Sequence, residues 1–208
     1  MRKRYFVIIL TFLSMGFSLF SVFGNSEKFY KEAWRFVEEI YVSKPKSAVE
    51  KLEELKANAE LEKNYPQMLA AIVKKGKVSE RFSDSSFVDC LNELHDCRAQ
   101  ISDSAALALS YYLEASMLLS YSIHNNHLIS ERTSLEGIVP DDINEWSENI
   151  FTQKIKDLTL KALEEPAIKK VEAKSFVPLI VIDEKKNSIG KGAKLYDFIV
   201  NEIVKKDK

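Results

Sequence analysis

The most apolar stretch in the body of this chain runs over residues 105–123 and contains one charged residue, Glu114. The preceding Ser-Asp-Ser at residues 102–104 is typical of a helix start, because such side chains accept hydrogen bonds from free backbone N–H groups. Three tyrosines and five serines from Ser104 onward make the segment too polar for contact with lipid on all sides. A helix surrounded by other helices is apolar nearly all round, so the sequence predicts a central buried helix here.

The rest of the chain predicts further helices joined by short connections. The sequence has only 6 Gly and 5 Pro, which disfavours a sheet with many turns. Helical spacing of apolar residues predicts helices at 27–42, over 89–97, from about Asp142 to Glu165 and at 195–204. Two more helices are predicted from start signals: one begins at Ser47, whose capping box is closed by Glu50, and one has Pro66 in its first turn. A short helical turn follows Pro166, and loops are predicted at 125–141 and 185–194. The run at 176–182 is strand-like. We therefore expect an all-α fold of antiparallel helical hairpins, packed as a short helical-repeat-like array with one short extended segment near 176–182.

Both cysteines lie in the sequence DCLNELHDC, from Asp89 to Cys97. On a continuous helix Cys90 and Cys97 share a face but lie two turns, about 10 Å, apart, whereas a disulfide needs Cα atoms within about 7 Å. His95 points about 140° away from Cys90 around the helix axis, so the two cannot share a metal ion. The spacing predicts a buried apolar stripe of Phe87, Cys90, Leu94, Cys97 and Ile101, with both thiols reduced. A disulfide across a helix break and a metal site are the alternatives.

Residues 1–24 have the pattern of a signal peptide. Three basic residues at positions 2–4 precede an apolar run at 5–23, and Val22-Phe-Gly24 provides small residues for cleavage. An uncleaved membrane anchor is the alternative, since about 19 apolar residues can span a bilayer. We expect secretion across the inner membrane to the periplasm or outer envelope, with residues 25–208 as a single helical domain.

The charge of the remaining chain argues against nucleic acid as a partner. Residues 1–24 hold three basic and no acidic residues, which leaves 27 basic and 31 acidic residues and a net charge of −4. Nucleic-acid binding needs a clustered basic surface instead.

No pattern in the sequence predicts catalytic, cofactor-binding or metal-binding residues. His124 and His127 have a spacing that could hold a metal from a helix end, but no third ligand accompanies them, which favours a polar helix terminus. The Ile-Gly-Lys-Gly at 189–192 lacks the Lys-Ser/Thr of a phosphate-binding loop and predicts a flexible loop. Asp141 and Asp142 precede an apolar periodic run, as helix caps do.

Four segments carry a resemblance to a known family. They are KPKSAVEKLEELKANAELEKNYPQ at 44–67, ISERT at 129–133, DDINEW at 141–146 and LYDF at 195–198. In this order and spacing they resemble the N-terminal helical segment of bacterial alpha-2-macroglobulin-like proteins, and the similarity extends over about residues 27–206. The resemblance implies a relation to protease traps of the cell envelope. The chain departs from that family because it has no Cys-x-Glu-Gln thioester sequence and no room for macroglobulin domains.

The resemblance and the residues together predict a non-enzymatic cell-envelope module that binds a protein partner, and a protein with macroglobulin-type domains is the candidate partner. Such a chain would be a truncated or split family member, or a free-standing copy of the helical module. We expect no cofactor, and membrane contact only if the N-terminal segment is retained. The loop at 125–141 is the candidate binding surface, and Trp146 is expected to be mostly buried against the central helix. The alternatives are an envelope hydrolase or sugar-binding enzyme with an unrecognised site, and a structural remnant of a broken gene.

Overall fold

The computed structural model describes residues 26–132, 139–180 and 192–206, and every regular element within these ranges is a helix. The expected signal peptide, residues 1–24, lies outside the described residues. The α-helices are residues 26–40, Pro45–Glu62 (α2), Tyr65–Ser79 (α3), Ser86–Cys97 (α4), Ser104–His124 (α5), Asn126–Ile129 (α6), Glu148–Glu164 (α7) and Leu195–Lys206 (α8). The 3-10 helices are Arg98–Gln100 (η1), Ile143–Glu145 (η2), Pro166–Lys169 (η3) and Ala173–Phe176 (η4).

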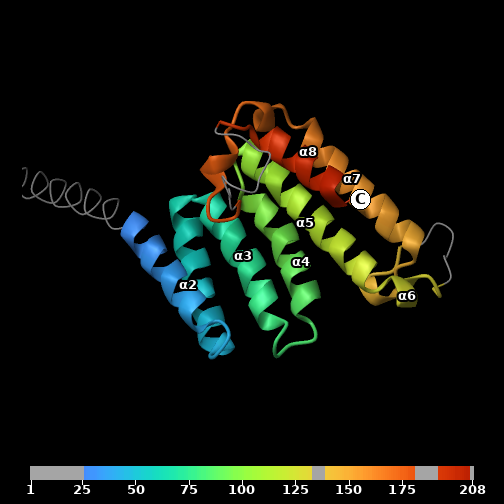
Figure 1. Ribbon diagram of the computed structural model, residues 1–208, viewed down its shortest axis with the longest axis horizontal. Helices are drawn as coiled ribbons and strands as arrows, with labels where there is room; N and C mark the ends of the chain where they lie inside the picture. The colour runs from blue at the N-terminus through green and yellow to red at the C-terminus, as the bar shows by residue number, and fades with distance from the viewer. Residues whose placement is uncertain (1–25, 133–138, 181–191, 207–208) are drawn as a thin grey trace, which may run out of the picture.

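The helices from residue 26 to α5 lie side by side in chain order (Figure 1). Their connections are short: Lys63, in the left-handed conformation with φ 54°, and Asn64 alone separate α2 from α3. Successive helices therefore run antiparallel. Helices α7 and α8 follow at the far side of α5, and α7 packs along α5. The prediction of an all-α fold of packed helices is confirmed.

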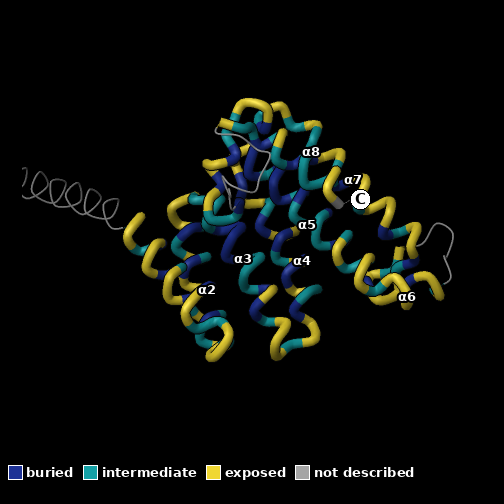
Figure 2. The backbone as a smooth tube through the Cα atoms, in the orientation of Figure 1, coloured by how far each residue is buried: buried dark blue, intermediate teal, exposed yellow. Residues whose placement is uncertain are grey.

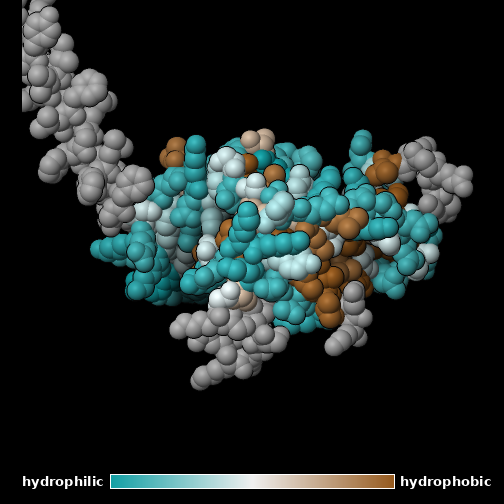
Figure 3. All heavy atoms as spheres, turned by 90° about the horizontal axis from the view of Figure 1, so that it is seen from above, coloured by the Kyte–Doolittle hydropathy of each residue, from teal (hydrophilic) through white to brown (hydrophobic). Residues whose placement is uncertain are grey.

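Helix α5 occupies the centre, as its composition predicts. Eight of its residues are buried, including Leu109 and Leu118, and dark blue positions follow it through the molecule in Figure 2. One end contributes Leu109 to a large core shared with residues 26–40, α2, α3 and α4. The other end contributes Leu118 to a smaller core with Phe151 of α7. No helix in the described ranges combines the length and hydrophobicity that a bilayer crossing requires. Figure 3 shows a mainly hydrophilic face on which hydrophobic side chains gather in one region.

Helix α2 begins earlier than the capping box predicts. Its first residue is Pro45, and Lys44 occupies the N-cap position without a side-chain hydrogen bond. Proline suits the first turn of a helix because its φ is fixed near the helical value and it has no N–H to leave unpaired. Ser47 therefore lies inside the helix, and its predicted role as the capping residue is wrong.

The long helix predicted from Asp142 to Glu165 is interrupted. Asp142 caps the 3-10 turn η2, accepting a hydrogen bond from the backbone N–H of Asn144 at 2.8 Å. Trp146 and Ser147 then adopt extended backbone conformations before α7 begins at Glu148. The indole N–H of Trp146 donates to the carbonyl oxygen of Pro140 at 2.7 Å, which holds this turn against the preceding segment.

Two further expectations need correction. The run at 176–182 is not a strand where it is described: Phe176 ends η4, residues 177–179 form a turn, and residues 181–182 lie outside the described ranges. Phe176 and Ile180 are buried in the large core, so these two apolar residues pack against helices and not in a sheet. The predicted loop at 125–141 contains the short helix α6, while residues 133–138 lie outside the described ranges.

Candidate functional site

A cavity in the described structure forms a groove between α3, α4 and α5. Its volume is about 770 Å³, and it is open to solvent. In Figure 1, α4 and α5 separate toward the end where α4 begins and α5 ends. The apolar and aromatic side chains that line it are Val73, Phe87, Cys90, Met117 and Tyr121, and the polar and charged ones are Lys77, Glu80, Ser83, Asp84, Ser86, Ser116, Ser120, His124 and Asn125. We name this cavity the α3–α5 groove.

Gly76 allows α3 and α4 to pack closely together at the groove. A Cβ atom at Gly76 would lie 2.6 Å from Sγ and 2.7 Å from Cβ of Cys90. Only glycine allows α4 to approach α3 so closely. Cys90, which Gly76 accommodates, also contacts Met117 of α5, with 4.0 Å between the two sulfur atoms.

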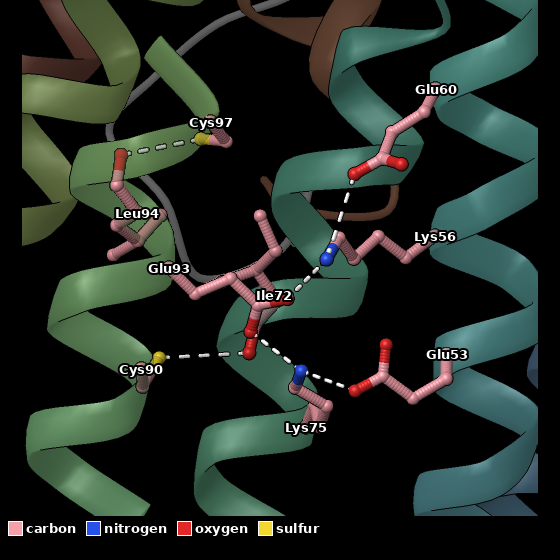
Figure 4. Close-up of polar contacts among 9 residues, drawn as sticks. All are labelled: Glu53, Lys56, Glu60, Ile72, Lys75, Cys90, Glu93, Leu94 and Cys97. Carbon is pink, nitrogen blue, oxygen red and sulfur yellow. Dashed lines mark hydrogen bonds and ion pairs between the residues drawn. The ribbon is translucent and has the colours of Figure 1, made fainter. Parts of the chain in front are cut away.

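The two cysteines are buried and free, as the helical stripe predicts. Cys90 and Cys97 are 2% and 3% exposed. The Cys90 thiol donates to the carbonyl oxygen of Ile72 at 3.6 Å, and the Cys97 thiol donates to that of Leu94 at 3.2 Å (Figure 4). Burial raises the pKa of Cys90 to about 12 and that of Cys97 to about 11. Neither thiol is therefore activated as a nucleophile, because nucleophilic cysteines have lowered pKa values.

A cluster of ionic side chains joins α2, α3 and α4 next to the cysteines (Figure 4). Glu93 of α4 pairs with Lys56 of α2 at 2.5 Å and with Lys75 of α3 at 2.6 Å. Lys75 also pairs with Glu53, and Lys56 pairs with Glu60. Burial alone would raise the pKa of Glu93, but hydrogen bonds and charges from the two lysines outweigh it and lower that pKa. The cluster consists of satisfied ion pairs that join three helices.

The structure brings no metal-ligating set together within the part of the chain it describes. His124 is the last residue of α5, and His127 lies in α6; both side chains are exposed. His95 is also exposed, on the side of α4 away from the buried thiols. The loop at 189–192 lies outside the described residues except for Gly192.

Stacked aromatic rings connect the α3–α5 groove to the turn that precedes α7. Phe87 stacks on Tyr121 with ring centroids 4.5 Å apart, and Tyr121 stacks on Phe151 at 5.7 Å. Trp146 meets Phe151 edge to face at 5.4 Å. Trp146 has intermediate exposure and packs against the smaller core, to which α5 contributes Ala115 and Leu118, so the expectation that it is mostly buried against the central helix is confirmed. Its ring contacts Phe151 of α7, and its indole N–H donates to the carbonyl oxygen of Pro140, which stabilises the turn.

The segments that carry the family resemblance have structural contacts. Arg132 of ISERT donates through Nη1 to the carbonyl oxygen of Trp146 of DDINEW at 2.9 Å. In LYDF, Leu195 is fully buried, and Asp197 accepts a hydrogen bond from the backbone N–H of Lys194 at 3.1 Å. Phe198 packs edge to face on Tyr112 of α5. These residues fix turns and helix starts, and their contacts alone indicate no binding activity.

A second, smaller cavity of about 430 Å³ lies beside the predicted binding loop. Leu119 and Ile123 of α5, Ile129 of α6, and Phe151 and Ile155 of α7 line it. Ile123 is 60% exposed at its edge. The part of the expected surface that is described thus adjoins an apolar hollow, but the larger groove on the other side of α5 was not predicted.

The fold and its cavities define the protein as an all-α protein of antiparallel helices with an apolar groove. No protein family, curated protein or solved structure matches the chain. The resemblance to the macroglobulin-like segment therefore rests on the four sequence segments alone.

Proposed function

We propose that this chain is an exported, non-enzymatic protein-interaction module of the cell envelope, and that the α3–α5 groove receives a segment of its partner. The observation that carries the proposal is the groove itself. It is open, about 770 Å³ in volume, and has Val73, Phe87, Met117 and Tyr121 along its inner wall. Apolar surface of this kind is stabilised when another apolar surface covers it.

The pKa shifts of two side chains on α4 support binding over catalysis; Cys90 lines the groove, and Glu93 lies outside it in the ion-pair cluster. A hydrolase that uses carboxyl groups needs one with a raised pKa to act as an acid near neutral pH. Glu93, the half-buried carboxylate nearest the cysteines, has a lowered pKa and two lysine partners. The Cys90 thiol at the groove has a raised pKa. Both shifts favour unreactive forms of these groups at neutral pH.

The envelope location and the partner class come from the sequence. Residues 1–24 have the composition of a signal peptide. The segments at 44–67, 129–133, 141–146 and 195–198 resemble the N-terminal part of macroglobulin-like proteins, so the proposed partner is an envelope protein with macroglobulin-type domains. A macroglobulin-like reading frame directly downstream of this gene would identify the chain as a split member.

Site-specific cross-linking tests the groove. Ser120 is exposed at the groove, and Ser175 is exposed outside it, so Ser120→Cys and Ser175→Cys provide a matched pair for a photoreactive maleimide. The native thiols are buried and react slowly. Labelled protein is mixed with envelope extract of the source cells and illuminated, and the products are identified by mass spectrometry. We expect a macroglobulin-domain protein cross-linked from position 120 and not from 175.

Two unlabelled competitors are compared in this experiment: the wild-type protein and a folded polar-groove variant, Val73→Thr with Met117→Gln. Excess wild-type protein should abolish the cross-link, whereas excess polar-groove variant should not. Equal products from both positions, or none from 120, would contradict the proposal.

A second test addresses protease trapping. The purified chain without residues 1–24 is incubated with a panel of proteases, and the remaining activity on a large protein substrate is measured. We expect full activity, because trapping by a thioester needs a cysteine beside a glutamine in a reactive ring, and both cysteines here are buried in a helix. Protection of the substrate by this chain alone would refute the proposal of a simple interaction module.

A further inference from the structure

We infer that the occupant of the α3–α5 groove is an amphipathic helix whose polar flank is basic, with lysine or arginine beside its apolar face. The inference rests on the proposed function and adds the chemistry of the partner segment. It combines the shape and apolar lining of the groove with the charges at its rim.

The groove suits a row of apolar side chains from one helix face. Its volume of about 770 Å³ is within the range of about 300–1,000 Å³ for sites that bury most of a ligand. Its apolar lining comes from Val73 of α3, Phe87 and Cys90 of α4, and Met117 and Tyr121 of α5, and the Phe87 ring stacks on that of Tyr121. Helices bound in such grooves anchor through side chains at positions i, i+3, i+4 and i+7. A flexible methionine in the wall lets the surface adapt to such anchors.

The rim of the groove is acidic. Glu80 and Asp84 line it, their side chains are exposed, and neither pairs with a cation among the described residues. The only lysine or arginine of the lining is Lys77, in the last turn of α3, where a cation offsets the negative end of its own helix.

One helix end at the groove adds to this charge. The carboxyl end of α5 lies there, at His124, and carries partial negative charge, whereas Lys77 already offsets that of α3. The amino end of α4 also lies there, but Asp89 in its first turn offsets its positive charge. A basic flank on the occupant would therefore meet complementary charge, whereas an acidic flank would be repelled.

A peptide library tests the inference directly. Eighteen-residue helical peptides, on the order of five turns long, are displayed with a randomised apolar face and randomised flanking positions. They are selected on the wild-type protein after depletion on the folded polar-groove variant, Val73→Thr with Met117→Gln. We expect lysine and arginine to be enriched at the flanking positions, and glutamate and aspartate to be depleted.

Charge reversal then tests the rim. The affinity of the selected peptides should fall by about tenfold for Glu80→Lys with Asp84→Lys. The matched control is Glu50→Lys with Glu164→Lys, two exposed carboxylates away from the groove. It makes the same change in net charge and should leave the affinity within about twofold. A peptide with its basic flank changed to glutamate should bind the charge-reversed protein more tightly than the wild type.

The outcomes separate the two proposals. Selected peptides with neutral or acidic flanks would overturn the basic-helix inference and leave the groove as a binding site. Equal losses of affinity in the control variant and the rim variant would also overturn the basic-helix inference and leave the groove as a binding site. If no sequence is enriched over depletion on the polar-groove variant, both this inference and the proposed use of the groove are wrong. Circular dichroism spectra and melting temperatures establish that each variant is folded.

Discussion

The single charge of the central helix is explained at the level of two residues. Glu114 pairs with Arg98 of η1, the segment that follows Cys97. Arg98 also donates through Nε to the hydroxyl oxygen of Ser110 at 3.1 Å and lies over the ring of Tyr111 at 4.4 Å. The sequence shows the charge within an apolar run, but the partner lies 16 residues earlier, after a change of chain direction. Periodicity within one helix therefore could not predict this pair.

We expect Arg98→Ala to destabilise the protein strongly. The side chains of Arg98 and Glu114 are only 10% and 17% exposed, so removal of the arginine would leave a poorly solvated carboxylate without its partner. The cost should be about 3–5 kcal/mol of the free energy of unfolding. Urea denaturation measures it, with Arg35→Ala as the control. Arg35 pairs with Glu39 on the surface and is 75% exposed, so its loss should cost about 0–1 kcal/mol. Equal losses in the two variants would contradict the buried pair.

We expect the buried thiols and the Tyr112 hydroxyl to make the protein less stable at alkaline pH. Burial raises the pKa of Cys90 to about 12, that of Cys97 to about 11 and that of Tyr112 to about 12. The folded state therefore keeps protons that the unfolded chain releases between about pH 9 and these values, so the free energy of unfolding should fall as pH rises through this window. Below about pH 8 these groups should contribute no pH dependence.

Urea denaturation at pH 7, 9 and 10.5 measures this effect. Cys97→Ala should reduce the loss between pH 9 and 10.5, because one of the groups with a raised pKa is absent. Intact mass of the native protein should show two free thiols that alkylate rapidly only in denaturant. A mass lower by two hydrogens, or a stability that increases toward pH 10.5, would refute the buried-thiol assignment.

At the scale of elements, sequence signals predict where helices lie better than how they begin. Pro66 and Asp103 occupy the first turn of α3 and the N-cap of α5 as predicted. The sequence places the start of α2 too late because a proline such as Pro45 can either end a preceding helix or occupy the first turn of the next one. The break before α7 was missed because the Trp146 indole bonds to Pro140, a contact that apolar periodicity does not encode.

The contact between α3 and α4 gives a prediction at this scale. Gly76→Ala would place a Cβ atom 2.6 Å from Sγ and 2.7 Å from Cβ of Cys90, so the helices must move apart. We expect a loss of about 1–3 kcal/mol in the free energy of unfolding, as for other overpacked cores. Cys90→Ala should not rescue Gly76→Ala, because the alanine retains the Cβ at 2.7 Å. A double-mutant cycle measured by urea denaturation tests this, and full rescue by Cys90→Ala would show that the sulfur alone makes the contact.

At the scale of the whole molecule, composition was sufficient for the fold class but not for the groove. The apolar run at 105–123 and the scarcity of Gly and Pro predicted packed helices around one central helix. The α3–α5 groove is lined by residues of three different helices, and how these helices pack together is a tertiary property. A sequence signal did exist: the Ser116, Met117, Ser120 and Tyr121 face of α5 mixes small polar and large side chains, which is unusual for a fully packed surface.

The continuity of α5 through both cores predicts that the molecule unfolds as one unit. Leu109 belongs to the large core and Leu118 to the smaller one, and the same helix carries both. The two tryptophans report on the two regions: Trp34 packs against the large core and donates to Gln67, while Trp146 packs against the smaller core.

Variants with a single tryptophan therefore provide a test. We expect the urea midpoint from tryptophan fluorescence to equal the midpoint from far-ultraviolet circular dichroism in Trp34→Phe and, separately, in Trp146→Phe. Coincident transitions from different probes are the mark of two-state unfolding. Each variant serves as its own control, because any change in stability caused by the substitution shifts both signals together. If the fluorescence of Trp146 changes at lower urea than the dichroism of the same variant, the smaller core unfolds separately. The region that contains α7 would then be an independent unit and not part of a single domain.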